Sequence, residues 1–225
     1  MLVDSILDFF RELRITVKLP KGVDVLYPYD NPQTFDLCRQ FYQKYYSDSN
    51  PRTLLTGINP GRFGSGTTGV SFTDPIKLEK YCDIRNDLPK KPELSADFIY
   101  AMIGSFGGPE EFYKRFYISS VSPLGFTMNG NNINYYDIPR LEKVITPFMI
   151  ESIDKMIAMG MRTDKCFCIG GDKNLKSLTK LNDKQKWFNE IVPLPHPRFI
   201  MQYRRKKMKE YIEFWITTLS SSLHE

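Results

Sequence analysis

Histidine is scarce in this chain, which has only two in 225 positions, His196 and His224. His224 is the penultimate residue, in a tail that we expect to fray. Any reaction that needs an imidazole must therefore use His196, which excludes a histidine-rich zinc site and a metalloprotease helix. A Gly-x-Ser-x-Gly motif is also missing, which argues against a hydrolase with a serine nucleophile.

Long apolar runs are absent too, and none approaches the roughly 20 residues of a membrane span. The N-terminus lacks the basic-then-apolar pattern of a signal peptide, so we expect a cytoplasmic protein without membrane contacts. The four cysteines do not form a disulfide framework. Cys166 and Cys168 share an apolar stretch without further ligands nearby, so we expect reduced core thiols, no metal and no other cofactor.

The composition, with 41% hydrophobic and 25% charged residues, is that of an ordered protein, and we expect a monomer with a single domain over residues 1–225. The net charge of +5 is modest but unevenly distributed. A basic cluster follows His196 and consists of Arg204, Arg205, Lys206, Lys207 and Lys209. Such a run is typical of a solvated helix face, although its position also suits a polyanion such as a nucleic acid.

Short apolar strands alternate with helices along the chain. Strands are predicted over Thr53–Ile58, Tyr117–Val121, Lys165–Ile169 and Glu190–Leu194. Helices are predicted over Val3–Leu13, Pro32–Tyr46, Ala96–Phe106, Pro109–Phe116, Arg140–Met159, Asp172–Leu178 and Tyr203–Leu219. Residues 83–93 and 129–134 are predicted as surface loops because turn residues dominate both. This alternation predicts an α/β fold with a parallel sheet covered on both faces.

Polar or glycine-rich residues follow each of the four predicted strands. Asn59, Ser120, the turn at residues 170–171 and His196 all lie at or just after the carboxyl end of a strand. Ligands of parallel sheets bind beyond these ends, so we expect the four positions to share one site.

The loop over Gly57–Phe72 is the densest in glycine and lets bare backbone approach a ligand closely. A phosphate-binding loop of a nucleotide enzyme is one interpretation. It is disfavoured because no Lys-Ser or Lys-Thr follows the glycines and the dinucleotide-binding spacing is absent.

Two motifs resemble a known family. Gly57-Ile58-Asn59-Pro60-Gly61 with Thr68-Gly69-Val70-Ser71-Phe72, together with His196-Pro197, is similar to the motifs of the uracil-DNA glycosylase superfamily, and most of all to its single-strand-selective monofunctional branch, family 3. The resemblance implies a three-layer α/β/α sandwich with a central, mainly parallel four-stranded sheet. It also implies an enzyme that flips a deaminated base out of DNA and hydrolyses its N-glycosidic bond in base excision repair.

The resemblance also implies roles for individual residues. Asn59 would position the water and His196 would donate a hydrogen bond to the departing base. A carboxamide is not a useful base, so Asn59 can only orient the water. Phe72 would stack on the flipped base, although a core aromatic is the alternative, and the backbone at Ile58 and Gly61 would border that base.

Two positions depart from the family pattern. Ser120 stands where the family usually has an asparagine that reads the pyrimidine edge, so xanthine or hypoxanthine are further candidate substrates. The second motif continues as Arg198-Phe199-Ile200-Met201-Gln202, which differs from the family. The residues from Phe199 to Gln202 are candidates for the wedge that fills the vacated stack. Further DNA contacts are predicted for Arg62, Arg198, Arg204 and Arg205.

One alternative remains from another class, a non-catalytic nucleic-acid binding module that keeps the base pocket. Neither motif contains a lysine for Schiff-base chemistry, so we expect an enzyme without lyase activity.

Overall fold

The computed structural model describes residues 1–221, and His224 lies outside them. Its central sheet consists of β2 (Arg52–Gly57), β3 (Phe116–Ser120), β6 (Met161–Ile169) and β7 (Glu190–Leu194). Within the described residues these strands pair in parallel in the order β3-β2-β6-β7. All residues of β2 and β3 are buried, as expected for strands covered on both faces. The predicted four-stranded parallel sheet is confirmed.

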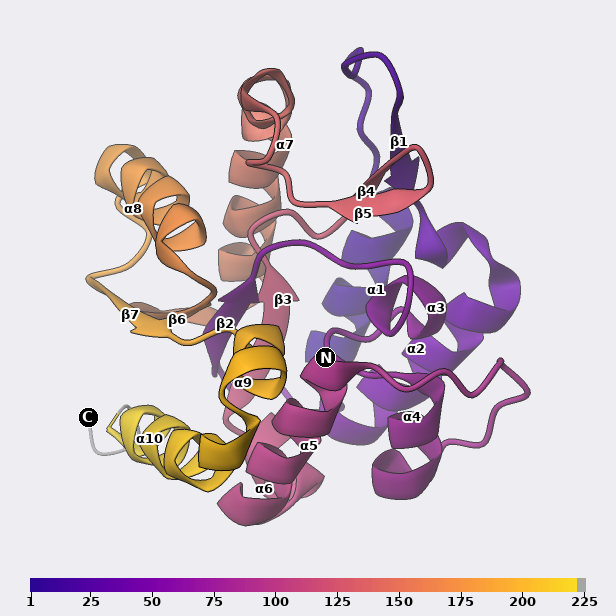
Figure 1. Ribbon diagram of the computed structural model, residues 1–225, viewed down its shortest axis with the longest axis vertical. Helices are drawn as coiled ribbons and strands as arrows, with labels where there is room; N and C mark the ends of the chain where they lie inside the picture. The colour runs from indigo at the N-terminus through magenta and orange to yellow at the C-terminus, as the bar shows by residue number, and fades with distance from the viewer. Residues whose placement is uncertain (222–225) are drawn as a thin grey trace.

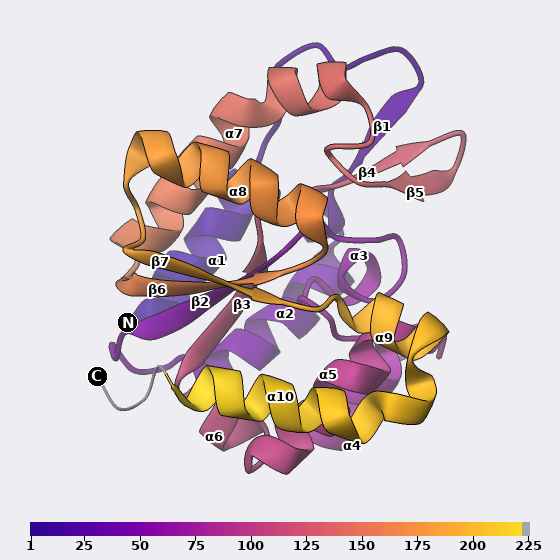
Figure 2. The same cartoon turned by 60° about the vertical axis from the view of Figure 1, so that its left-hand side comes forward.

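Helices cover both faces of this sheet. Figure 2 shows α7 (Pro139–Ala158) and α8 (Asp172–Gln185) on one side, with α5 (Leu94–Phe106), α6 (Pro109–Tyr113) and α10 (Met208–Ser220) on the other. The remaining helical segments are α1 (Leu2–Glu12), η1 (Pro28–Asp30), α2 (Pro32–Tyr45), α3 (Ser65–Thr68), α4 (Pro75–Cys82), α9 (Pro197–Tyr203) and η2 (Arg205–Lys207). The expected α/β/α sandwich is confirmed. None of the helices within residues 1–221 combines the length and apolarity needed to cross a bilayer.

Aromatic packing fixes β3 against α2. Tyr42, Tyr46 and Tyr117 lie with their ring centroids 5.3–6.1 Å apart, and the Tyr46 hydroxyl donates to the carbonyl of Phe116 at 2.9 Å. Because edge-to-face and tilted contacts of this kind add about 0.5–1.5 kcal/mol each beyond area burial, they anchor the strand that ends at the site. All four cysteines are buried and unpaired, which confirms the prediction of reduced core thiols.

Residues 129–134 are not the surface loop that we predicted. They belong to a hairpin of β4 (Gly125–Met128) and β5 (Asn131–Ile133), which pairs with β1 (Val23–Leu26) in a small antiparallel sheet of order β1-β4-β5. The turn is Asn129-Gly130, with φ of 50° and 73°, which matches the twist of a tight hairpin. Figure 1 shows this sheet beside the loop that follows β2.

The C-terminal region also differs from its prediction. A helix was expected from Tyr203, but α9 already begins at Pro197, and α10 starts only at Met208. Proline is favoured in the first turn of a helix, and His196 caps this one. Helix α8 continues to Gln185 where Leu178 was expected, because a leucine stripe keeps it packed beyond that point.

Candidate active site

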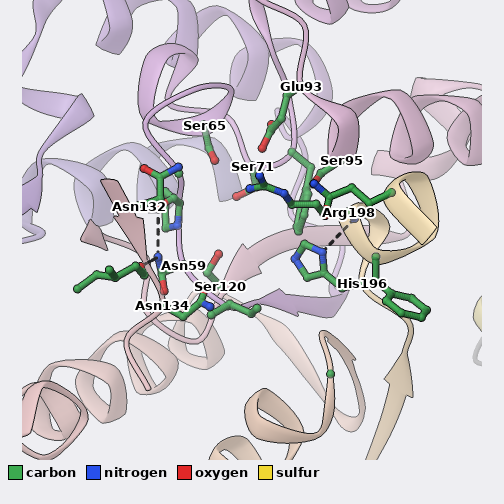
Figure 3. A pocket seen from close by; sticks show the side chains of 18 of the residues that line it. Asn59, Ser65, Ser71, Glu93, Ser95, Ser120, Asn132, Asn134, His196 and Arg198 are labelled. Atoms are coloured by element: carbon green, nitrogen blue, oxygen red, sulfur yellow. Dashed lines mark hydrogen bonds between the residues drawn. The ribbon is translucent and has the colours of Figure 1, made fainter. Parts of the chain in front are cut away.

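The carboxyl ends of the four parallel strands open into one cavity of ≈ 400 Å³. Gly57 pairs with Ser120 and Ile169 pairs with Leu194, so the segments that follow the four strands begin close together. Asn59 and His196 both line this cavity. Figure 3 shows them on opposite sides, with Ser120 between them.

The carboxamide of Asn59 is held by the hairpin segment. Its Oδ1 accepts a hydrogen bond from the backbone N–H of Tyr135 at 2.9 Å, and its Nδ2 donates to the carbonyl of Ile133 at 3.2 Å. These two bonds fix which way the amide points. A carbonyl oxygen has two lone pairs, so Oδ1 keeps one for a further donor such as water.

His196 is preset as a neutral hydrogen-bond donor. Its Nδ1 accepts from the backbone N–H of Arg198 at 3.1 Å, so in the neutral ring the hydrogen sits on Nε2. Burial in the cavity wall, reinforced by the nearby Arg198 cation, lowers the pKa of His196 to about 4. The imidazole therefore carries no charge at neutral pH and presents an N–H.

Phe72 lies half-buried in the cavity, with its ring close to Gly57 at the end of β2. A Cβ added to Gly57 would lie 3.1 Å from the Phe72 ring, tighter than an ordinary contact, so a larger residue there would push the ring away. The ring centroid is 6.0 Å from that of His196, at an interplanar angle of 57°. Phe72 has a φ of 51°, an uncommon conformation for a bulky residue and one that is often found at functional sites.

Glu93 faces the cavity from the start of α5. Its Oε2 is buried with no hydrogen-bond partner among the described residues. Burial, followed by the Asp74 carboxylate, raises the pKa of Glu93 to about 7, although the Arg198 and Lys77 cations oppose this shift. An acid near half-ionisation at neutral pH can donate or accept a hydrogen bond.

The structure brings together most of the residues that the sequence predicted. The cavity is lined by Ile58, Asn59, Gly61, Phe72, Ser120, His196, Arg198, Phe199 and Gln202. Arg62, Arg204 and Arg205 do not line it. Arg204 instead lies with its guanidinium 5.6 Å from the ring centroid of Phe199, and Arg205 belongs to the exposed turn η2.

Sequence reasoning missed the residues that support the site. The hairpin contributes Asn132, Ile133 and Asn134, and the Asn129-Gly130 pair was the signal that would have revealed it. Glu93 carried no comparable signal, because a glutamate before a helix is typical of a solvated N-terminus. Within residues 1–221 no group of three or more histidines, cysteines or acids is placed to hold a metal ion.

Comparison with known families agrees with this geometry. The model of the uracil DNA glycosylase superfamily matches residues 43–220, which is most of the chain. The chain belongs to this superfamily. The matched part contains β2 and its loop, all four strands of the central sheet, and both Asn59 and His196.

Individual members of the superfamily are also similar. The single-strand selective monofunctional uracil-DNA glycosylase of Rattus norvegicus is 27% identical over 154 residues, which is 57% of this chain and 54% of that protein. Its Mus musculus counterpart is 25% identical over 158 residues, 59% of this chain and 55% of that protein. The chain thus spans about half the length of these curated relatives.

A solved structure covers the whole chain. The wild-type SMUG2 of Pedobacter heparinus superposes with a TM-score of 0.96 and 44% sequence identity, over 100% of this chain and 99% of that one. The two proteins therefore share one fold over the described residues, including the small second sheet.

Proposed function

We propose that this protein is a monofunctional DNA glycosylase that releases uracil from DNA in base excision repair. The observation that carries the proposal is the position of Asn59 and His196, two polar side chains oriented by backbone hydrogen bonds on opposite sides of one cavity. The superfamily match and the uracil-DNA glycosylase names of the relatives agree with it.

The two groups suit the two charges that develop when the bond from C1′ to the base nitrogen breaks. The bonding electron pair leaves with the base, so the base becomes negative and the sugar positive. The Nε2–H of His196 donates to the base oxygen, which stabilises that negative charge. No proton needs to move for this step.

Water completes the reaction at C1′. The free lone pair of Asn59 Oδ1 accepts a hydrogen bond from this water and aims its oxygen at the sugar carbon. The water loses its proton to solvent after the bond forms, since an amide cannot take it up. Position 59 carries an amide and not a carboxylate, so no general base activates the water. Catalysis therefore rests on positioning the water and on stabilising the negative charge of the departing base, and we expect slow turnover.

The base reaches this cavity by leaving the DNA stack. Phe72 offers its ring to the extruded base, and Ser120 offers one hydroxyl to its edge. A single hydroxyl discriminates less strictly than a carboxamide, so xanthine and hypoxanthine are proposed as additional substrates. Arg198, Phe199 and Gln202 lie at the cavity, where Phe199, 44% exposed, is the candidate wedge.

The proposal is tested with the purified chain and oligonucleotides that carry uracil, xanthine or hypoxanthine, in single and double strands. Chromatography of the free base should detect uracil, and borohydride should trap no covalent adduct. Binding without release of any base would favour the non-catalytic module, and a trapped adduct would contradict the monofunctional assignment.

A further inference from the structure

The loop that follows β2 has a second face. Gly61 and Ser65 line the cavity of ≈ 400 Å³ that holds Asn59 and His196, named here the large cavity. The residues between them line a separate cleft of ≈ 160 Å³. The lining of this cleft, named here the side cleft, consists of Arg62, Phe63, Gly64, Thr67, Pro75, Pro89 and Lys91. The two hollows are neighbours, since Gly61 and Phe63 are two residues apart and their Cα atoms lie within roughly 7.6 Å.

The side cleft combines an exposed aromatic ring with two cations. Phe63 is 44% exposed, with the Arg62 guanidinium 5.2 Å and the Lys91 ammonium 5.1 Å from its ring centroid. Pro75 and Pro89 add further apolar wall. Among the described residues that line the cleft none is acidic.

This chemistry fits a nucleotide. An aromatic face in a positively charged groove is how proteins hold single-stranded nucleic acid, because every base has a face that stacks and every phosphate attracts cations. A solvated surface would more often expose the cations and bury the ring.

We propose that the side cleft binds the nucleotide next to the extruded one on the same DNA strand. Its base lies against Phe63, and Arg62 and Lys91 face its phosphate. The proposal rests on the proposed function, since the extruded base must occupy the large cavity. It also assigns Arg62, which the sequence had placed beside the DNA, to a neighbouring nucleotide outside the large cavity.

The chain offers a matched control. Tyr81 is 37% exposed, and the Lys80 ammonium lies 5.1 Å from its ring centroid, so this pair repeats the cation and ring of the side cleft. Tyr81 lines neither the large cavity nor the side cleft. Phe63→Ala, Phe63→Trp and Tyr81→Ala therefore separate stacking in the side cleft from general loss of a surface aromatic.

The test measures binding of single-stranded oligonucleotides that carry 2′-fluorodeoxyuridine, which resists cleavage, so the readout does not need activity. Phe63→Ala should weaken binding roughly five-fold or more, the effect of losing one stacked base, while Phe63→Trp and Tyr81→Ala bind like the wild type. Two further oligonucleotides, which carry an abasic spacer on the 5′ or on the 3′ side of the uridine, complete a double-mutant cycle between Phe63 and the neighbouring base. On the one that lacks the base stacked on Phe63, Phe63→Ala should weaken binding no further.

The outcomes are distinct. An equal loss on all three oligonucleotides, or an equal loss from Tyr81→Ala, overturns the proposal. Thermal unfolding checks that each variant folds. Release of uracil by the wild type is measured separately, so a protein that binds as expected but releases no base refutes the proposed function and leaves the side cleft supported.

Discussion

At the scale of single residues, the backbone arranges the reactive groups. The sequence identified Asn59 and His196, but it carried no information on which atoms of their side chains are free. For Asn59 those atoms follow from bonds to Ile133 and Tyr135, which lie far away in the chain. For His196 they follow from the backbone N–H of Arg198 in the same turn. The orientation of Asn59 therefore depends on contacts that its own motif does not encode.

The pH dependence of His196 is one consequence. Its pKa of about 4 lies below the ordinary 6.5, so the native ring takes up no proton between these values while the unfolded ring does. Base release should stay constant as the pH falls from 8 to about 5, and the contribution of His196 to folding stability should decrease as the pH falls from about 6.5 to 4. NMR titration of the imidazole, assigned with His224→Gln, checks this directly. Proton uptake by His196 near pH 6.5 would contradict it.

The carboxyl of Glu93 should make folding stability depend on pH in the opposite direction. The native carboxyl holds its proton to about pH 7, because burial and Asp74 outweigh Arg198 and Lys77, whereas the unfolded chain loses it near pH 4.5. The stability contributed by Glu93 is thus present at low pH and is lost as the pH rises to about 7. Glu93→Gln keeps the neutral form, so it should be more stable than the wild type at pH 8 but not at pH 5.

Urea unfolding of both proteins at pH 5 and pH 8 measures this difference. Glu79→Gln is the control, since hydrogen bonds from Lys90 and from the Asn86 backbone lower the pKa of Glu79. That substitution should cost nearly the same stability at pH 5 as at pH 8, because the Glu79 carboxyl is ionised in both the native and the unfolded protein over this range. If Glu93→Gln, like the control, shows no difference between the two pH values, the Glu93 carboxyl is ionised in the native state and our account of it is wrong.

At the scale of elements, the hairpin β4–β5 was the main surprise. Its residues are polar and rich in asparagine, which favours a loop, yet the Asn129-Gly130 pair sets a tight turn that aligns β5 with β4. The four central strands were predictable because their apolar runs are short and bounded by turns. The hairpin was not, because only pairing with β4 places β5 in a sheet.

The hairpin holds the Asn59 side chain directly, because the carbonyl of Ile133 in β5 accepts a hydrogen bond from its amide. Gly130 and Gly160 both have a positive φ, of 73° and 105°, and a Cβ at either would meet no atom within 4 Å. Gly130→Val and Gly160→Val should each lower stability by about 1–2 kcal/mol, since a branched side chain is strained at these angles. Only Gly130→Val should slow base release, because it disturbs the segment that holds Asn59. Equal rates for the two variants would show that the hairpin plays no part.

At the scale of the whole molecule, one sheet edge gathers four distant segments. The rule that ligands bind beyond the carboxyl ends of parallel strands placed Asn59, Ser120 and His196 together before any coordinates, and the common cavity confirms this. Glu93 and the side cleft were beyond that rule, since both depend on how the long segment between β2 and β3 folds back. The monomeric state and the cytoplasmic location stay predictions, and light scattering at the mass of 26.3 kDa tests the first.

The central claim is that Asn59 and His196 act on one extruded base. The rate of uracil release in a single turnover, measured for the wild type, Asn59→Ala and His196→Ala, tests it most directly. We predict that each variant is slower by more than about tenfold while its unfolding midpoint stays near that of the wild type. A folded variant of either residue that releases uracil at the wild-type rate would contradict the account.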